Sequence, residues 1–397
     1  MTAQNIKRWL FFISLFIIFL SVFLGGIPSN NVVLAKAEDG KNDLYHSVEE
    51  QLEKLELTDL QKYVDSLGNF TDERVSERLL AYIEGEGVDY ATFGKQITTV
   101  LFAKVIEILP AFSCIAAVAL LSGLIASLKS SSLKHTSAEM ISLIAYVSAL
   151  IPMLAILTEC FRGALESVSA MQKQMQIVFP LMLTLMAASG GTLTAAVCRP
   201  AVGFFATNIV TVISSVVFPI TVTIMAFSIA GNLSKELKIS RFTAFFKSIN
   251  KWIIGICISA FGIFFTLQGI TAANYDGVVR RAAKYAIGNG IPIVGGFLSG
   301  GFDLAVAGSV LIKNALGTMS VFLMMAVIFE PIVLLISVNV LLRLTSAITQ
   351  PFGEGRISDF LGETAENLHY CTAGLLFTAF LYFLTIMLLV CASEALF

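Results

Sequence analysis

Apolar residues dominate the chain from residue 98 to its end, and they recur in long runs. Seven of these runs approach the roughly 20 residues that an α-helix needs to cross a bilayer. They are 108–128, 140–157, 177–197, 204–230, 252–273, 318–342 and 371–391, of which the second is the shortest. The pattern predicts an all-α, polytopic integral membrane protein with about seven membrane segments, formed by a multi-span domain over 98–397.

The N-terminus has the pattern of a secretory signal. Lys7 and Arg8 precede an apolar core, and the small-x-small stretch 35–37 follows it. We therefore predict a signal peptide over 1–37, with an uncleaved first transmembrane helix as the alternative. In both cases the chain from Glu38 onward is exported.

The stretch 38–97 differs from the rest of the chain because it is polar and acidic. It holds 15 of the 28 acidic residues. Ser47 and Glu50 match a capping box, and apolar residues then recur at helical spacing, which predicts a small helical extracytoplasmic region. A second short helix is expected between Thr71 and Gly85.

About 60 residues with few large apolar side chains form only a marginal core. We therefore expect 38–97 to fold against a partner or the membrane surface. A loosely ordered juxtamembrane segment is the alternative.

Composition supports a lipid environment for the remainder. The chain is 56% hydrophobic and 14% charged, with a mean hydropathy of +0.82, whereas soluble domains carry roughly a quarter charged residues.

The basic, phenylalanine-containing stretch 232–251 predicts a helix lying in the membrane interface, although a charged loop would have the same composition.

Sidedness stays open at the level of sequence. An exported N-terminus places Lys129 and Lys134 inside, as the positive-inside rule requires. Counting seven crossings onward then puts the basic stretch 232–251 outside, against the rule. The cluster Arg280, Arg281 and Lys284 lies on the opposite side of the fifth segment. A re-entrant segment or a failure of the rule would explain the conflict.

The stretch 285–317 holds eight glycines and is the most unusual part of the sequence. Small residues let helices approach closely, which favours a packing or oligomerisation face. Glycine and proline also permit a re-entrant pore or gate element at membrane depth. The candidates for either role are Pro292, Gly295, Gly296, Gly300 and Gly301.

Charged residues inside apolar segments are functional candidates because they are costly there. Glu330 precedes Pro331 in the middle of a run and could face a water path or a donor on a neighbouring helix. Asp303 and Lys313, ten residues apart, could neutralise each other if the glycine-rich stretch folds back. A buried polar contact that fixes helix register is the alternative for each.

No catalytic constellation is visible in the sequence. The three histidines are scattered, and the six cysteines lie in or beside apolar segments without metal-ligand spacing. We therefore expect no enzymatic activity, no cofactor or metal, and no nucleic-acid partner.

The stretch 283–317 carries a more specific signal. Ala283-Lys284-Tyr285, the run 291–296, Asp303 and the run 311–317, preceded by an exported acidic region, resemble stage III sporulation protein AE of endospore-forming bacteria. The resemblance implies a multi-pass protein in the outer, mother-cell-derived forespore membrane. It also implies a channel or secretion-like complex with other stage III sporulation proteins of the same operon and, through them, a forespore membrane protein.

Two functions therefore remain as hypotheses. The first is a subunit of the sporulation transenvelope complex, needed for forespore development and late forespore gene expression, with a homo-oligomer as one form of assembly. The second is a stand-alone secondary transporter in which Glu330 or Asp303 couples an ion. The sequence has one strong glycine-rich break where transporters often have two matching ones, which favours the first.

Overall fold

The computed structural model describes residues 38–67, 74–84, 90–129, 135–204, 208–233, 239–271, 295–352 and 355–394. Every regular element within those ranges is a helix. The predicted all-α class is confirmed for this part of the chain. The predicted signal peptide, residues 1–37, lies outside the described residues.

The helices fall into a short N-terminal group and a long bundle. The short group is α2 (Glu38–Lys54), α3 (Thr58–Ser66) and α4 (Val75–Glu84). The bundle begins with α5 (Tyr90–Lys129), α6 (His135–Ala188), α7 (Thr192–Phe204), α8 (Val210–Val212), the π-helix η2 (Ile213–Val217), α9 (Phe218–Leu233) and α10 (Ser240–Thr271). It ends with α12 (Gly295–Thr349), the 3-10 turn η3 (Gln350–Phe352) and α13 (Gly355–Glu394).

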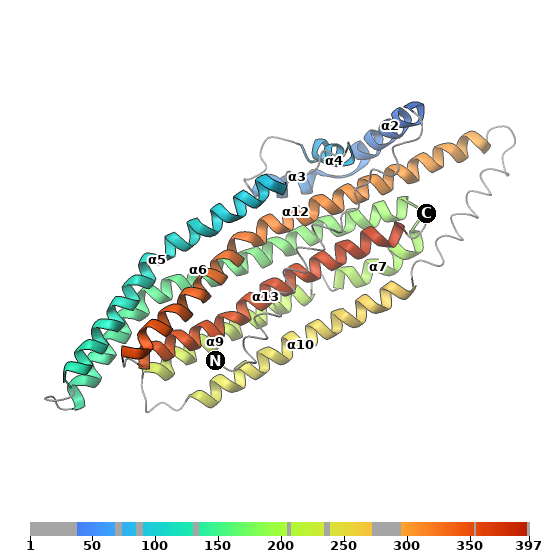
Figure 1. The fold of residues 1–397 in the computed structure, drawn as a ribbon. Coiled ribbons are helices and arrows are strands. Elements are labelled where there is room, and N and C mark those ends of the chain that lie inside the picture. Colours follow the sequence, from blue (N-terminus) through green and yellow to red (C-terminus); the bar gives the residue numbers. More distant parts are fainter. Residues whose placement is uncertain are drawn as a thin grey trace.

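α12 is the central helix of this elongated bundle. It contacts α13, α6 and α5 along its length, and α2 covers its N-terminal part (Figure 1). Its 55 residues extend for about 80 Å. Between Val306 and Leu335, a fully described stretch, Glu330 is the one exposed residue. The apolar core of the bundle therefore lies around α12.

The described residues contain six helices that are long and apolar enough to cross a membrane, against about seven predicted segments. The difference lies in α6. The predicted segment 140–157 and the first part of 177–197 belong to this one helix, because the polar stretch 158–176 between them is also helical. α6 ends in a turn at Gly190, whose φ of 94° is in the left-handed region that glycine adopts readily.

This helix count changes the predicted side of the basic stretch 232–251. α5 ends, α6 begins, α9 ends and α10 begins at the same end of the bundle (Figure 1). Lys129 at the end of α5 and Arg241 at the start of α10 therefore share one side, and the positive-inside rule assigns that side to the cytoplasm. The prediction that put 232–251 outside came from treating 140–157 and 177–197 as two crossings, whereas the prediction that 280–284 lies on the opposite side from 232–251 is untested. The cluster at residues 280–284 lies outside the described residues.

The surface of α6 changes character along its length. From residue 140 to 155 its exposed residues are almost all apolar: Met140, Ile144, Val147, Ser148, Ile151, Leu154 and Ala155. From residue 158 to 176 they are all polar: Thr158, Glu159, Arg162, Glu166, Ser169, Lys173 and Gln176. A water boundary is therefore expected near residue 157, inside a continuous helix.

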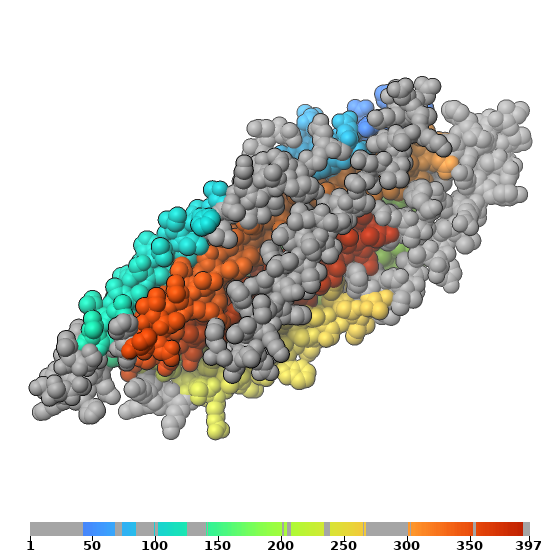
Figure 2. Space-filling model, viewed as in Figure 1, coloured from blue at the N-terminus to red at the C-terminus, as the bar shows by residue number. Residues whose placement is uncertain are grey.

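The neighbouring helices place this boundary at the same level. α5 and the C-terminal half of α12 lie side by side on one face of the molecule (Figure 2). Lys104 of α5 and Glu330 of α12 form an ion pair. Beyond Glu330, the exposed large side chains of α12 are apolar: Ile336, Val340, Leu344 and Ile348. The stretch 330–349 is about 28 Å long, close to the thickness of the hydrocarbon layer.

Two local predictions are wrong in detail. Ser47 does not cap a helix, because α2 begins at Glu38 and the Ser47 hydroxyl accepts a hydrogen bond from Gln51 Nε2 at 3.1 Å inside it. The stretch 232–251 does not hold a separate interfacial helix, because residues 240–251 are the first turns of α10 and continue into its apolar part. The second predicted N-terminal helix is present as α4.

Candidate functional site

α2 attaches the predicted exported region to the N-terminal part of α12. Gln51 Nε2 donates to the Ala305 carbonyl at 3.1 Å, and the Ser309 hydroxyl donates to Gln51 Oε1 at 2.8 Å. A Cβ atom on Gly308 would lie 2.8 Å from Gln51 Nε2, so the absence of a side chain permits this approach. Two apolar residues of α2 are buried beside the contact: Val48 and Leu52. Gly308 therefore serves packing within the chain.

A second attachment joins α3 to α6 and α12. The Tyr63 hydroxyl donates to the Ala170 carbonyl at 3.2 Å and lies 3.5 Å from Gln174 Oε1. Gln174 is fully buried, and its Nε2 donates to the Ser320 carbonyl of α12 at 2.8 Å. Burial raises the pKa of Tyr63, so the phenol remains a hydrogen-bond donor at neutral pH. One glutamine thus connects three elements.

Lys313 is the fully buried charged residue of α12. Its Nζ donates to the Val390 carbonyl near the C-terminal end of α13 at 2.6 Å, where the helix dipole favours a positive charge. One turn further, a Cβ on Gly317 would lie 2.6 Å from Val390 Cγ2. Gly317 therefore allows α12 and α13 to approach closely enough for the Lys313 contact. The sequence identified Lys313 as a candidate from its charge alone. In the structure it has a partner on another helix, the Val390 carbonyl.

Glu330 has the donor on a neighbouring helix that the sequence suggested. Its Oε1 lies 3.0 Å from Lys104 Nζ of α5, and Lys104 also pairs with Glu107 at 3.2 Å. The Glu330 side chain is 65% exposed, and α12 continues through Pro331 without interruption. This surface ion pair gives no support to the ion-coupling role that the transporter hypothesis requires of Glu330.

The predicted pairing of Asp303 with Lys313 is not formed. Both residues lie on the uninterrupted helix α12, which separates them by about 15 Å along its axis. The pairing required the glycine-rich stretch to fold back, and from Gly295 onward it is a continuous helix. The chain therefore does not fold back within 295–317, whereas 285–294 lies outside the described residues.

The structure describes the surroundings of only some of the glycine and proline candidates at 292–301. Pro292 lies outside the described residues, and so do the surroundings of Gly295, Gly296 and Gly300, which form the first turns of α12. A Cβ on Gly301 would meet no atom within 4 Å. The assembly role of these residues stays a prediction. Within the described part of the stretch 285–317, the glycines with close contacts are Gly308 and Gly317, which local sequence could not distinguish from the others.

A polar cluster between α12 and α13 was missed. Asn339 Nδ2 donates to the Ala365 carbonyl at 2.7 Å, and Arg343 Nε donates to Asn339 Oδ1 at 2.9 Å. Arg343 Nη2 lies 2.8 Å from His369 Nε2, which must accept because a guanidinium only donates. Asn339 lies inside the apolar run 318–342, so the rule applied to Glu330 could have identified it.

Buried amides also join α9 to its neighbours. Asn367 of α13 donates to the Ser228 hydroxyl, and Asn250 of α10 donates to the Thr221 hydroxyl, both at 2.9 Å. Among the described residues, no group of three or more His, Cys, Asp or Glu side chains could hold a metal ion. The polar groups described above form hydrogen bonds between helices.

Comparison with known proteins gives one consistent result. The family described as stage III sporulation protein AE matches residues 76–393 of the chain. A relative described by the same words, from Bacillus subtilis (strain 168), is 26% identical over 231 residues. Those residues are 58% of this chain and 58% of the relative, so the match spans a little over half of the relative's length. No solved structure matches the chain.

Proposed function

Because the chain belongs to the stage III sporulation protein AE family, we propose that it is a membrane subunit of a transenvelope channel complex linking mother cell and forespore. The family implies a role in sporulation, and the six apolar helices indicate a membrane protein. The proposed location is the outer forespore membrane. The proposed partners are the other stage III sporulation proteins of the same operon and, through them, a forespore membrane protein.

The observation that supports this proposal is the placement of α2, α3 and α4. They pack on α12 and α6 toward the bundle end opposite the basic helix ends Lys129 and Arg241 (Figure 1). The positive-inside rule makes that end extracytoplasmic. In an engulfed forespore this side of the outer membrane faces the inner one. A partner between the two membranes would therefore meet α2–α4 and the polar surface of α6.

The proposal is tested by displacing α2 from the bundle. Gly308→Leu places a side chain where Gln51 lies and should lower recovery of sporulation partners with the tagged protein about tenfold, because overpacking of this kind costs about 1–3 kcal/mol. Gly262→Leu on α10, where a Cβ meets nothing within 4 Å, is the matched control. The measurement is quantitative co-purification from sporulating cells at equal membrane levels of each variant.

Unchanged partner recovery with Gly308→Leu would count against a role for the docked helices. A parallel pair, Gly296→Leu and Gly300→Leu, tests the predicted assembly face at the start of α12. If the Gly296→Leu and Gly300→Leu pair loses the partners while Gly308→Leu retains them, the contact surface would be the start of α12 and not α2–α4.

A further inference from the structure

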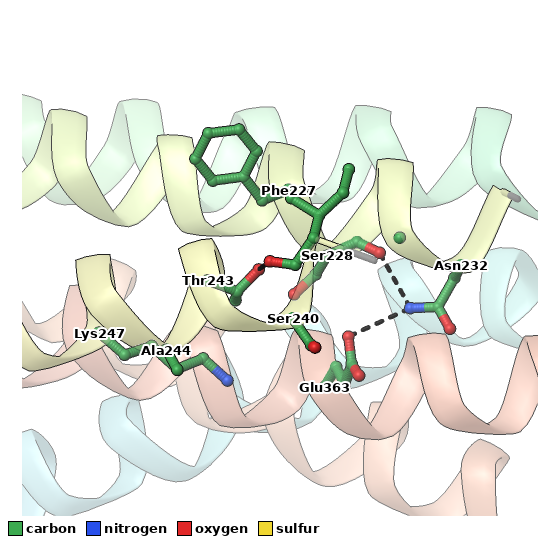
Figure 3. Close-up of a pocket in the computed structure, with 10 residues that line it drawn as sticks. Phe227, Ser228, Asn232, Ser240, Thr243, Ala244, Lys247 and Glu363 are labelled. Carbon is green, nitrogen blue, oxygen red and sulfur yellow. Dashed lines mark hydrogen bonds between the residues drawn. The ribbon is translucent and has the colours of Figure 1, made fainter. Parts of the chain in front are cut away.

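A pocket of about 250 Å³ lies between the end of α9, the start of α10 and the first part of α13 (Figure 3). Its polar lining comes from three helices: Ser228, Asn232, Ser240, Thr243, Lys247 and Glu363. In Figure 3 the Lys247 amine, the Ser240 hydroxyl and the Glu363 carboxylate lie along one side, with Phe227 on the other. The pocket takes no part in the attachments of α2–α4.

Opposite charges enter this pocket from different helices. Lys247 of α10 is 23% exposed, and its Nζ lies 3.9 Å from Glu366 Oε2, a long contact for an amine with three N–H groups. Glu363 Oε2 of α13 accepts a hydrogen bond from Asn232 Nδ2 at 3.1 Å, and a carboxylate has further acceptor positions. The pocket is therefore complementary to a ligand that carries both a negative and a positive group.

Aromatic side chains border the pocket and continue onto the outer surface. The ring of Phe227 lies 5.5 Å from that of Phe246 and 6.5 Å from that of Phe242. Phe242 and Phe245 are 63% and 59% exposed. A ligand with a polar head in the pocket would thus have an apolar surface beside it for a hydrocarbon tail.

The exposed face of α10 changes character along the helix, from basic and aromatic residues near its start to apolar ones further on. Arg241 and Lys251 are exposed near the start of the helix. Trp252 follows at 71% exposed, and apolar residues such as Ile256 and Ile263 are exposed after it. Tryptophan is enriched where the polar and apolar layers of a bilayer meet. The pocket lies toward the start of α10, within about 18 Å of Trp252, and its Glu363 lies on α13 beside the part of α12 that bonds to Ala365 and His369.

We propose that this pocket binds the headgroup of a phospholipid with a primary ammonium group, phosphatidylethanolamine. The phosphate contacts Lys247 and the hydroxyls of Ser240 and Thr243, and the ammonium donates to Glu363. Phosphatidylcholine has no N–H to donate, and phosphatidylglycerol leaves Glu363 without a cation. The assignment is independent of the proposed sporulation role.

The test uses the purified full-length protein in detergent. It is incubated with an equimolar mixture of phosphatidylethanolamine, phosphatidylglycerol and phosphatidylcholine with identical acyl chains, and the retained lipids are measured by mass spectrometry. We expect phosphatidylethanolamine to be enriched about tenfold over both others, as charge-assisted hydrogen bonds are strong. Equal retention of the three lipids, or preference for phosphatidylglycerol, would overturn the proposal.

Two variants and a control make the test specific. Glu363→Gln can still accept from Asn232 and should lose the preference for phosphatidylethanolamine, whereas Lys247→Gln should lower retention of all three lipids. Glu166→Gln, an exposed change on α6, should retain the parent pattern, and thermal unfolding checks that each variant is folded. An unchanged preference in Glu363→Gln would contradict the assignment. Displacement of the lipid by an equal concentration of free glycerophosphoethanolamine would refute a lipid ligand.

Discussion

The two halves of α6 have opposite surfaces on one continuous helix. From residue 140 to 155 the exposed side chains are almost entirely apolar, whereas from 158 to 176 every exposed residue is polar. Both halves bury apolar residues in the bundle: Tyr146 of the first half packs on Phe360 of α13, and Ser167 and Gln174 of the second half bond to α12 beside buried Val168 and Met171. The difference therefore lies in the surroundings of the helix and not in its packing.

This comparison separates helix length from membrane thickness. α6 has 54 residues and is about 80 Å long, well beyond a bilayer of roughly 30 Å. The apolar half fits one crossing, and the polar half extends into water on the side where α2–α4 are attached. Apolar residues that are buried inside the protein and apolar residues that face lipid give the same high mean hydropathy. Hydropathy alone therefore does not tell the two apart.

The largest expected effect comes from a charge in the apolar half. Ile144→Asp places a carboxylate on a lipid-facing position that is 65% exposed, at a cost of about 2.5–3.5 kcal/mol. It should strongly reduce the amount of folded protein recovered from membranes. The matched change in the polar half, Glu166→Leu, should alter stability by less than about 0.5 kcal/mol. Quantitative blotting and thermal unfolding check both, and equal effects would remove the distinction between the halves.

The next effect concerns the core that both halves share. Gly317→Leu forces a side chain onto Val390 and should destabilise the contact of α12 with α13 by about 1–3 kcal/mol, disturbing the Lys313 hydrogen bond as well. Gly262→Leu on α10 meets open space and should change the melting temperature little. A thermal scan in detergent that gave similar melting temperatures for the two variants would contradict the packing described here.

The smallest effect tests the attachment of α3 to the polar half. Tyr63→Phe removes the hydrogen bond to Ala170 and should cost about 0.5–1.5 kcal/mol at neutral pH. Because burial raises the pKa of Tyr63 above its ordinary 10.0, the phenol stabilises the fold below pH 10, and this contribution is lost as the pH rises through the raised pKa.

The measurement for Tyr63 is a comparison of melting temperatures of the parent and Tyr63→Phe at pH 8 and above pH 10. The difference between them should shrink at the higher pH. A difference that stays constant would show that the pKa of Tyr63 is the same in the folded and the unfolded chain, and would contradict its raised value.

Local sequence was sufficient for some of these features and insufficient for others. Apolar runs identified the helices, and the rarity of charge in such runs identified Lys313 and Glu330. Their partners Val390 and Lys104 lie on other helices, far away in sequence, where no local pattern points to them. The polar stretch 158–176 separates two of the predicted membrane segments but is helical in the structure, because polar residues are typical both of a loop and of a helix that leaves the membrane.

The glycines illustrate the same limit. Gly300, Gly308 and Gly317 all lie among small and apolar residues of one stretch, yet close contacts are described at Gly308, against Gln51 of α2, and at Gly317, against Val390 of α13. Which glycine is required for packing depends on the helix that lies opposite. That information comes from tertiary structure alone.

The central claim is that the water boundary crosses α6 and that its polar half is extracytoplasmic. The direct test is labelling of single cysteines with a membrane-impermeant maleimide on intact protoplasts of non-sporulating cells that produce the protein, where the extracytoplasmic face is open to the medium, after replacing the six natural cysteines. Glu166→Cys should react from outside, and Ile144→Cys should react neither on protoplasts nor after lysis. Equal labelling at the two positions, or reaction of Glu166→Cys only after lysis, would contradict the account.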